Sequence, residues 1–252
     1  MPQLTVFSWL VWIAVIALQS VLIAIMVRNG LYKRWPSLLS FVSIQLFESI
    51  LLFSVAQVVS NPHLRPALYF WVYWSLSSIT DAIEIWMIVQ IGCELAGVSA
   101  QVRKRISIGV PSLALINLLA SLALTLESPV YSKVVLIVSY FDKAICLAWL
   151  VTFLYIALPA EALGIEWPRE VKGIAIGFAI EVASATAASW MPTLKPGMPF
   201  ISEAKGILYL VSLCIWSSSL RKRNYAPENM PTAERVGIYL QTYTRVIERI
   251  RR

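Results

Sequence analysis

Charged and amide side chains recur inside the long apolar segments of this chain. Measured from the ends of each segment they fall at similar depth, and they are Glu48, Asp81, Glu84, Asn117, Asp142, Lys143 and Glu181. A charge at the centre of a bilayer costs about 2.5–3.5 kcal/mol on insertion scales. We therefore expect these side chains to face a bundle interior, where they are candidates for binding a small solute or cation, or for relaying protons.

The charges in this layer do not balance, since it holds five carboxylates and only one lysine, Lys143. Asp81 and Glu84 are three positions apart and share one helical face, and two carboxylates this close resist joint ionisation. Either most of these acids carry a proton, or a cation or a water-filled cavity compensates them. The alternative is a structural network of interhelical hydrogen bonds, which is common in membrane bundles.

The segments that must position these residues predict an all-α membrane protein. Hydrophobic residues make up 58% of the chain and charged residues 14%, against about 25% charged residues in soluble domains. A helix needs roughly 20 apolar residues to cross a bilayer, and seven segments are long enough. We expect spans at about 4–27, 37–60, 67–97, 106–126, 133–158, 173–192 and 201–220. The first lacks the basic start of a cleaved signal peptide, so we expect it to remain.

Basic residues near the span ends predict the orientation. One side would hold Arg28, Lys33, Arg34, Arg103, Lys104, Arg105, Arg169, Lys172, Arg221, Lys222 and Arg223, and the other only Arg65, Lys133 and Lys195. The positive-inside rule then places the N-terminus outside and the C-terminus in the cytoplasm of a plasma membrane, the inner membrane in a bacterium. The net charge of +7 is explained by this rim, so no nucleic-acid partner is expected.

Aromatic residues near the span ends are interpreted as interface anchors. They include Tyr69 and its neighbours in the third span, together with Trp35 and Trp167. Lys205 begins the seventh span and is expected at the outer rim, with a snorkelling stem. The bundle resembles microbial rhodopsins in architecture alone, because Lys205 is too near the span end for a retinal site.

Two patterns concern Glu48 and Glu181. Trp35-Pro36 and Trp167-Pro168 each precede a span, and the two glutamates follow at nearly the same spacing. This could reflect a duplicated three-helix unit with binding between the repeats, or two independent uses of proline at a helix start. Glu181 also lies in a stripe of small residues that includes Gly173 and Gly177, which predicts close helix packing with Glu181 inside the bundle.

The chain divides into a transmembrane domain, residues 1–223, and a cytoplasmic tail, residues 224–252. In the tail, apolar residues recur at helical spacing. The opposite face carries Arg235, Arg245, Arg249, Arg251 and Arg252. A basic amphipathic helix of this kind could lie on the anionic leaflet or bind a protein partner.

The motifs of common enzymes and cofactor sites are missing from the sequence. Cys93, Cys146 and Cys214 show no metal-ligand spacing, His63 is the only histidine, and no phosphate-binding glycine motif is present. No cofactor or metal is therefore expected. Asp81 and Glu84 could hold Mg²⁺ for a phospholipid substrate, but most acids lie too deep for an enzyme of that class.

Three functions follow from these patterns. The first is a small-solute or ion transporter that uses the carboxylate layer and could be proton-coupled. The second is a membrane sensor or accessory subunit without its own output domain, which contacts a partner or the lipid surface through its tail. The third is an intramembrane enzyme, which the depth of the acids disfavours.

Overall fold

The fold is known from a computed structural model. It describes residues 6–59, 61, 63–95, 100–125, 129, 133–141, 144–146, 148–149, 152, 168–194 and 200–221. Asp142, Lys143, Trp167, Lys195, Lys222, Arg223 and the whole tail from 224 to 252 lie outside these residues, so the predictions made for them stay predictions.

The described part of the chain is all-helical and contains no strand, which confirms the predicted class. The helices are α1 (Val6–Arg28), the short 3-10 helix η1 (Leu31–Lys33), α2 (Pro36–Val58), α3 (Leu64–Leu95), α4 (Ala100–Leu124), α6 (Arg169–Leu194) and α7 (Phe200–Arg221). Residues 133–141 are also helical. Gly30, at φ +68°, turns the chain between α1 and η1, and Pro36 occupies the first turn of α2, where its missing N–H costs nothing.

Several helices extend beyond the predicted spans. α4 begins at Ala100 rather than near residue 106, so Arg103, Lys104 and Arg105 lie within its first turns and not in a loop. α6 begins at Arg169 and likewise contains Lys172. The predicted bounds followed apolar residues, whereas a helix continues through basic residues whose long side chains can reach the interface.

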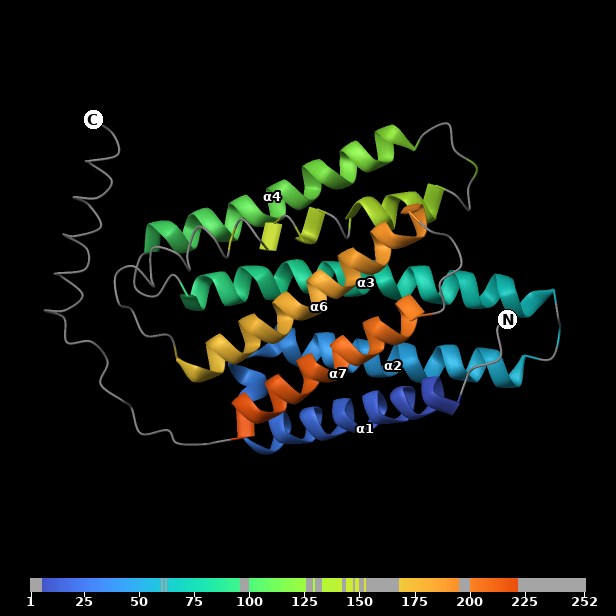
Figure 1. The fold of residues 1–252 in the computed structure, drawn as a ribbon. Helices are drawn as coiled ribbons and strands as arrows, with labels where there is room; N and C mark the ends of the chain where they lie inside the picture. Colours follow the sequence, from blue (N-terminus) through green and yellow to red (C-terminus); the bar gives the residue numbers. More distant parts are fainter. Residues whose placement is uncertain are drawn as a thin grey trace, which may run out of the picture.

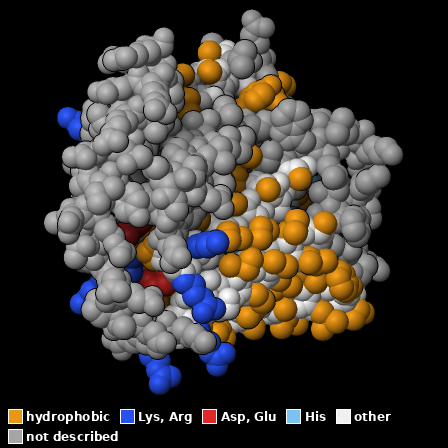
Figure 2. Space-filling model, turned by 60° about the vertical axis from the view of Figure 1, so that its left-hand side comes forward, with side chains coloured by type: hydrophobic (Ala, Val, Ile, Leu, Met, Phe, Trp, Pro, Cys, Tyr) orange, Lys and Arg blue, Asp and Glu red, His pale blue; other side chains and the backbone are white. Residues whose placement is uncertain are grey.

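Four helices of the described chain are long and apolar enough to cross a membrane: Val6–Arg28, Pro36–Val58, Leu64–Glu94 and Arg103–Ala123. Their outward surfaces fit this role. Exposed apolar side chains include Leu10, Ile13, Ile116 and Leu119, and hydrophobic residues cover a broad face of the molecule (Figure 2). A membrane protein follows from these helices, while the seven-span count and the orientation stay predictions.

Five of the helices form a closed ring. α1 contacts α2, α2 contacts α3, α3 contacts α6, α6 contacts α7, and α7 returns to α1, while α4 lies against the outside of α3. α1, α2, α3 and α4 lie roughly along one common direction, across the view of Figure 1, and α6 and α7 are tilted relative to them. The core of the ring is aromatic, with Phe41, Phe178 and Trp216 fully buried.

α6 and α7 approach each other closely through glycine. A Cβ atom added at Gly173 would lie 1.9 Å from Ser219 Oγ, and one added at Gly177 would lie 2.4 Å from Trp216 Nε1. The Trp216 Nε1–H instead donates a hydrogen bond of 3.1 Å to the Ile174 carbonyl oxygen. The predicted packing role of the small-residue stripe is therefore confirmed for these two glycines.

We call the end of the ring where α1 ends and α2 begins the basic end. Arg34 lies there and links α3 and α6. Its guanidinium lies 2.9 Å from Glu170 Oε2 in α6 and 3.5 Å from Glu94 Oε2 in α3. Gln90 donates to the Arg34 carbonyl oxygen and accepts from Ser37 Oγ. Trp35, predicted to be an interface anchor, is instead fully buried beside this network, so that prediction is wrong.

Replacing Gly177 with alanine should destabilise the bundle. The new methyl group would force Trp216 to move and would disturb its bond to Ile174, and overpacking of this kind costs about 1–3 kcal/mol. Thermal unfolding of the purified protein in detergent measures the effect. Gly109→Ala is the matched control, because nothing lies within 4 Å of a Cβ at Gly109 in α4. Equal melting temperatures for the two variants would contradict the packing argument.

Arg34→Met should lower the unfolding midpoint, because it leaves Glu94 and Glu170 without this shared partner. A double-mutant cycle of Arg34→Met with Glu170→Gln should give a coupling of about 0.5–1 kcal/mol, which weakens at high salt. Lys33→Met removes the neighbouring positive charge and serves as control. A coupling indistinguishable from zero would show that the 2.9 Å pair contributes nothing.

Candidate functional site

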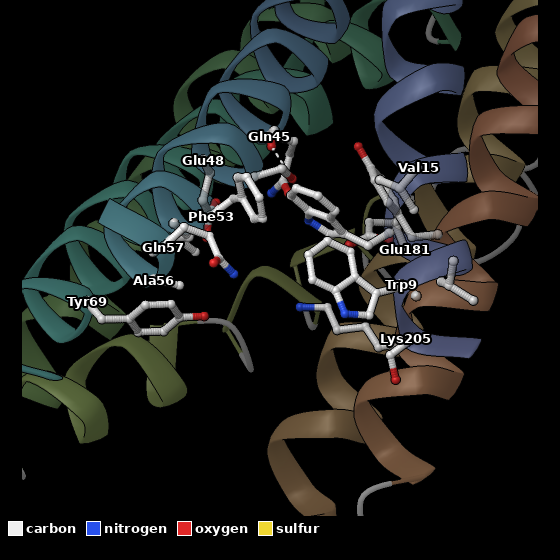
Figure 3. A pocket seen from close by; sticks show the side chains of 17 residues that line it. Trp9, Val15, Gln45, Glu48, Phe53, Ala56, Gln57, Tyr69, Glu181 and Lys205 are labelled. Carbon is white, nitrogen blue, oxygen red and sulfur yellow. Dashed lines mark hydrogen bonds between the residues drawn. The ribbon is translucent and has the colours of Figure 1, made fainter. Parts of the chain in front are cut away.

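A pocket of about 440 Å³ lies inside the helix ring. Its lining comes from all five helices of the ring, and the residues used below are Trp9, Trp12, Gln45, Glu48, Phe53, Gln57, Tyr69, Glu181, Lys205 and Tyr209. The side chains from α2 and α3 face those from α1 and α7 across the pocket (Figure 3).

The pocket extends from the middle of the ring toward the end opposite the basic end. Trp9, Tyr69 and Lys205 lie near the first turns of α1, α3 and α7, and Gln57 lies in the last turn of α2. Glu48 and Glu181 lie deeper, near the centres of α2 and α6. The carboxylates therefore form the inner part of the pocket, and aromatic and amide side chains form its outer part.

Glu48 reaches the pocket because one face of α2 is turned toward it. Gln45, Glu48, Leu52 and Ala56 line the pocket at spacings of three and four residues, which places them on one side of a helix. The Glu48 side chain is only 9% exposed although it contacts the cavity. Its depth and its inward direction agree with the sequence-based prediction.

Glu181 is positioned by the glycine packing of α6. It follows Gly177 by one helical turn, so the face that packs against α7 carries its carboxylate into the ring. The residue is 5% exposed, and within the described part of the chain its Oε2 atom has no hydrogen-bond partner. A buried carboxylate oxygen without a partner is costly, so this atom is a candidate position for a donor or a cation from a ligand.

Lys205 is the pocket residue that the sequence did not identify. It was expected at the outer rim, and it does lie in the second turn of α7, but its side chain is half-buried and lines the pocket. It interacts electrostatically with both Glu48 and Glu181. A long flexible stem on a tilted helix brings the amine toward the carboxylates, which depth along the sequence alone does not show.

Tyr209 connects the carboxylates to α1. Its hydroxyl oxygen accepts a buried hydrogen bond of 3.0 Å from Gln19 Nε2. The same tyrosine lies within electrostatic range of Glu181, Glu48 and Glu84. Spacing offered a weak signal for this residue, because Lys205, Tyr209 and Trp216 recur on one face of α7.

Of the other predicted residues, Asp81, Glu84 and Asn117 are not among the described residues that line the pocket, and Asp142 and Lys143 lie outside the described residues. Asp81 and Glu84 are buried in α3, at 3% and 9% exposure, which confirms that they lie inside the bundle. Asn117 donates to the Leu113 carbonyl oxygen of its own helix at 2.8 Å. Within the described residues, no three His, Cys, Asp or Glu side chains are placed to hold a metal ion, so Asp81 and Glu84 gain no third such ligand there.

Tyr69 also differs from its prediction as an interface anchor, since it lines the pocket opposite α1. Of its neighbours, Phe70, Trp71, Tyr73 and Trp74 contact one another edge to face or at a tilt. Trp71 is 43% exposed, which fits the anchoring role. Aromatic composition could not separate the ring that turns inward from those that turn outward.

Comparisons with protein-family models, with curated proteins and with solved structures found no match to this chain.

Tyr209→Phe should destabilise the protein, because it removes the acceptor of the Gln19 amide in a buried site. Gln19 Oε1 already has no hydrogen-bond partner in the described structure, and an unsatisfied buried polar group costs about 1–3 kcal/mol. Thermal unfolding should show recovery in the double variant Gln19→Leu with Tyr209→Phe, which removes both polar groups. The exposed Tyr32→Phe is the control. A Tyr209→Phe variant as stable as this control would refute the assignment.

Proposed function

We propose that this chain is a membrane transporter for a small solute or ion, with the pocket inside the helix ring as its binding site. The observation that carries the proposal is the pair of carboxylates, Glu48 and Glu181, from different helices at the inner wall of one pocket. Ionisable groups inside a membrane domain are expensive and commonly mark ion or substrate paths.

The remaining features support a site that changes its charge during a cycle. Lys205 interacts with both carboxylates, so a bound cation or a proton would compete with its amine for them. Glu48 follows Pro36 by 12 residues and Glu181 follows Pro168 by 13, and this difference of one residue, about 100° on a helix, does not prevent the two side chains from lining one pocket. The order of events would be binding at the carboxylates, release of Lys205, and rearrangement of the helices.

The plasma membrane is the proposed location, with the basic end in the cytoplasm. At that end α1 and α7 end and α2, α4 and α6 begin (Figure 1). The adjoining stretches of the described chain carry Arg28, Lys33, Arg34, Arg103, Lys104, Arg105, Arg169, Lys172 and Arg221, and Lys and Arg side chains lie in the left and lower part of Figure 2. The positive-inside rule favours this orientation, and the pocket would then open to the outer side.

Proton flux into liposomes that contain the purified protein tests the proposal. The vesicles hold a pH-sensitive dye, and a potassium diffusion potential drives uptake. We expect flux above that of empty vesicles, with a reduction of roughly tenfold or more in Glu48→Gln and Glu181→Gln, because each loses a group that can hold the proton.

Asn117→Ala is the control for this experiment, since the Asn117 amide is bonded within its own helix. It should retain wild-type flux. Flux equal to wild type in both glutamate variants would remove these residues from the mechanism, and absence of flux in the wild-type protein would reject proton transport.

A further inference from the structure

The charges that face the pocket do not cancel. Among the described lining residues, Glu48 and Glu181 are the acids and Lys205 is the base. With all three ionised, the pocket carries one negative charge in excess. Glu181 Oε2 has no hydrogen-bond partner among the described residues and belongs to a residue that is 5% exposed, so it marks the place where that excess is least compensated. A ligand with one positive charge would neutralise it.

The outer wall of the pocket is aromatic. Trp9 and Trp12, one turn apart in α1, lie edge to face with ring centroids 5.7 Å apart. Phe53 of α2 lies 5.8 Å from Trp9 and 4.9 Å from Trp12, and Tyr69 of α3 completes this wall. Tryptophan and tyrosine faces attract cations, especially organic ammonium groups, in sites that exclude water.

The excess negative charge and the aromatic wall together favour one class of ligand over others. An anion would meet two carboxylates. A zwitterion could pair with Lys205 but adds no net charge, so the excess would remain. A bare inorganic cation prefers a cage of several oxygen ligands, whereas most of this wall is ring and aliphatic surface. The volume of about 440 Å³ is that of a site for a small organic molecule.

Resting on the transport function proposed above, we infer that the pocket binds an organic monocation, an ammonium group attached to a small apolar body. The ammonium group lies against Glu181 and Glu48, and the apolar body lies against Trp9, Trp12 and Phe53. Lys205 is then a tethered competitor: its amine interacts with the same carboxylates and repels the ammonium group, so that two positive charges share the two acids.

Binding of simple organic cations to the full-length protein in detergent tests this inference. The probes are tetramethylammonium, choline and benzyltrimethylammonium, titrated by calorimetry and followed by tryptophan fluorescence, which Trp9 and Trp12 should report. We expect binding that is tightest for benzyltrimethylammonium. The neutral isostere of choline, 3,3-dimethyl-1-butanol, and the zwitterion glycine betaine should bind far more weakly, because neither supplies a net positive charge.

Variants separate the two parts of the site. Trp9→Leu should weaken cation binding by about three- to tenfold through loss of a ring face, and Glu181→Gln should weaken it further. Lys205→Met should tighten it, since the competing charge is removed, while Lys33→Met at the basic end should leave it unchanged. A Lys205→Met variant that weakens cation binding would overturn the competitor role.

The outcomes also separate this inference from the transport proposal. Equal binding of choline and its neutral isostere, or no binding of any of the three cations at millimolar concentration, would overturn the inference even if proton flux through Glu48 and Glu181 is found. Selective cation binding without proton flux would support the ligand class and reject proton transport.

Discussion

The close approach of α6 and α7 is the constraint on which the rest of the structure depends. Gly173 and Gly177 leave no room for a side chain against Ser219 and Trp216, so the two helices meet backbone to side chain over two turns. That contact fixes the rotation of α6 about its own axis. The same rotation turns Glu181 into the ring, and the hydrogen bond from Trp216 to the Ile174 carbonyl oxygen holds it there.

The pocket forms because the five helices close into a ring. α7 packs on α1 as well as on α6, and at their crossing a Cβ at Gly206 would lie 3.0 Å from a methyl carbon of Val11. Small residues therefore allow α7 to approach both of its neighbours. On the other side, α2 and α3 present Glu48 and Tyr69 toward the same space. Glu48 from the first half of the sequence thus lines the same pocket as Glu181 and Lys205 from the second half.

The sequence predicted the kind of fold and the depth of the acidic residues, but not the other residues that line the pocket with Glu48 and Glu181. Helical class, burial of Glu48, Asp81, Glu84 and Glu181, and the packing role of the glycines follow from hydrophobicity and spacing, and the structure agrees. The sequence did not show that Lys205 and Tyr69 line the pocket, and it wrongly placed Trp35 at the interface, because position along a span does not reveal which way a side chain points. For the same reason the sequence did not show that the Asn117 amide donates to the Leu113 carbonyl oxygen of its own helix at 2.8 Å.

The aromatic core also has a consequence for the direction in which the pocket can exchange its contents. Phe41 lies edge to face with both Phe178 and Trp216, Trp149 adds a fourth ring against Phe178, and Tyr209 contacts Trp216. The three central rings have no exposed surface and lie between the carboxylates and the basic end. Hydrated ions cannot pass through rings packed in this way. In the transporter proposed above, these rings would close the pocket toward the basic end.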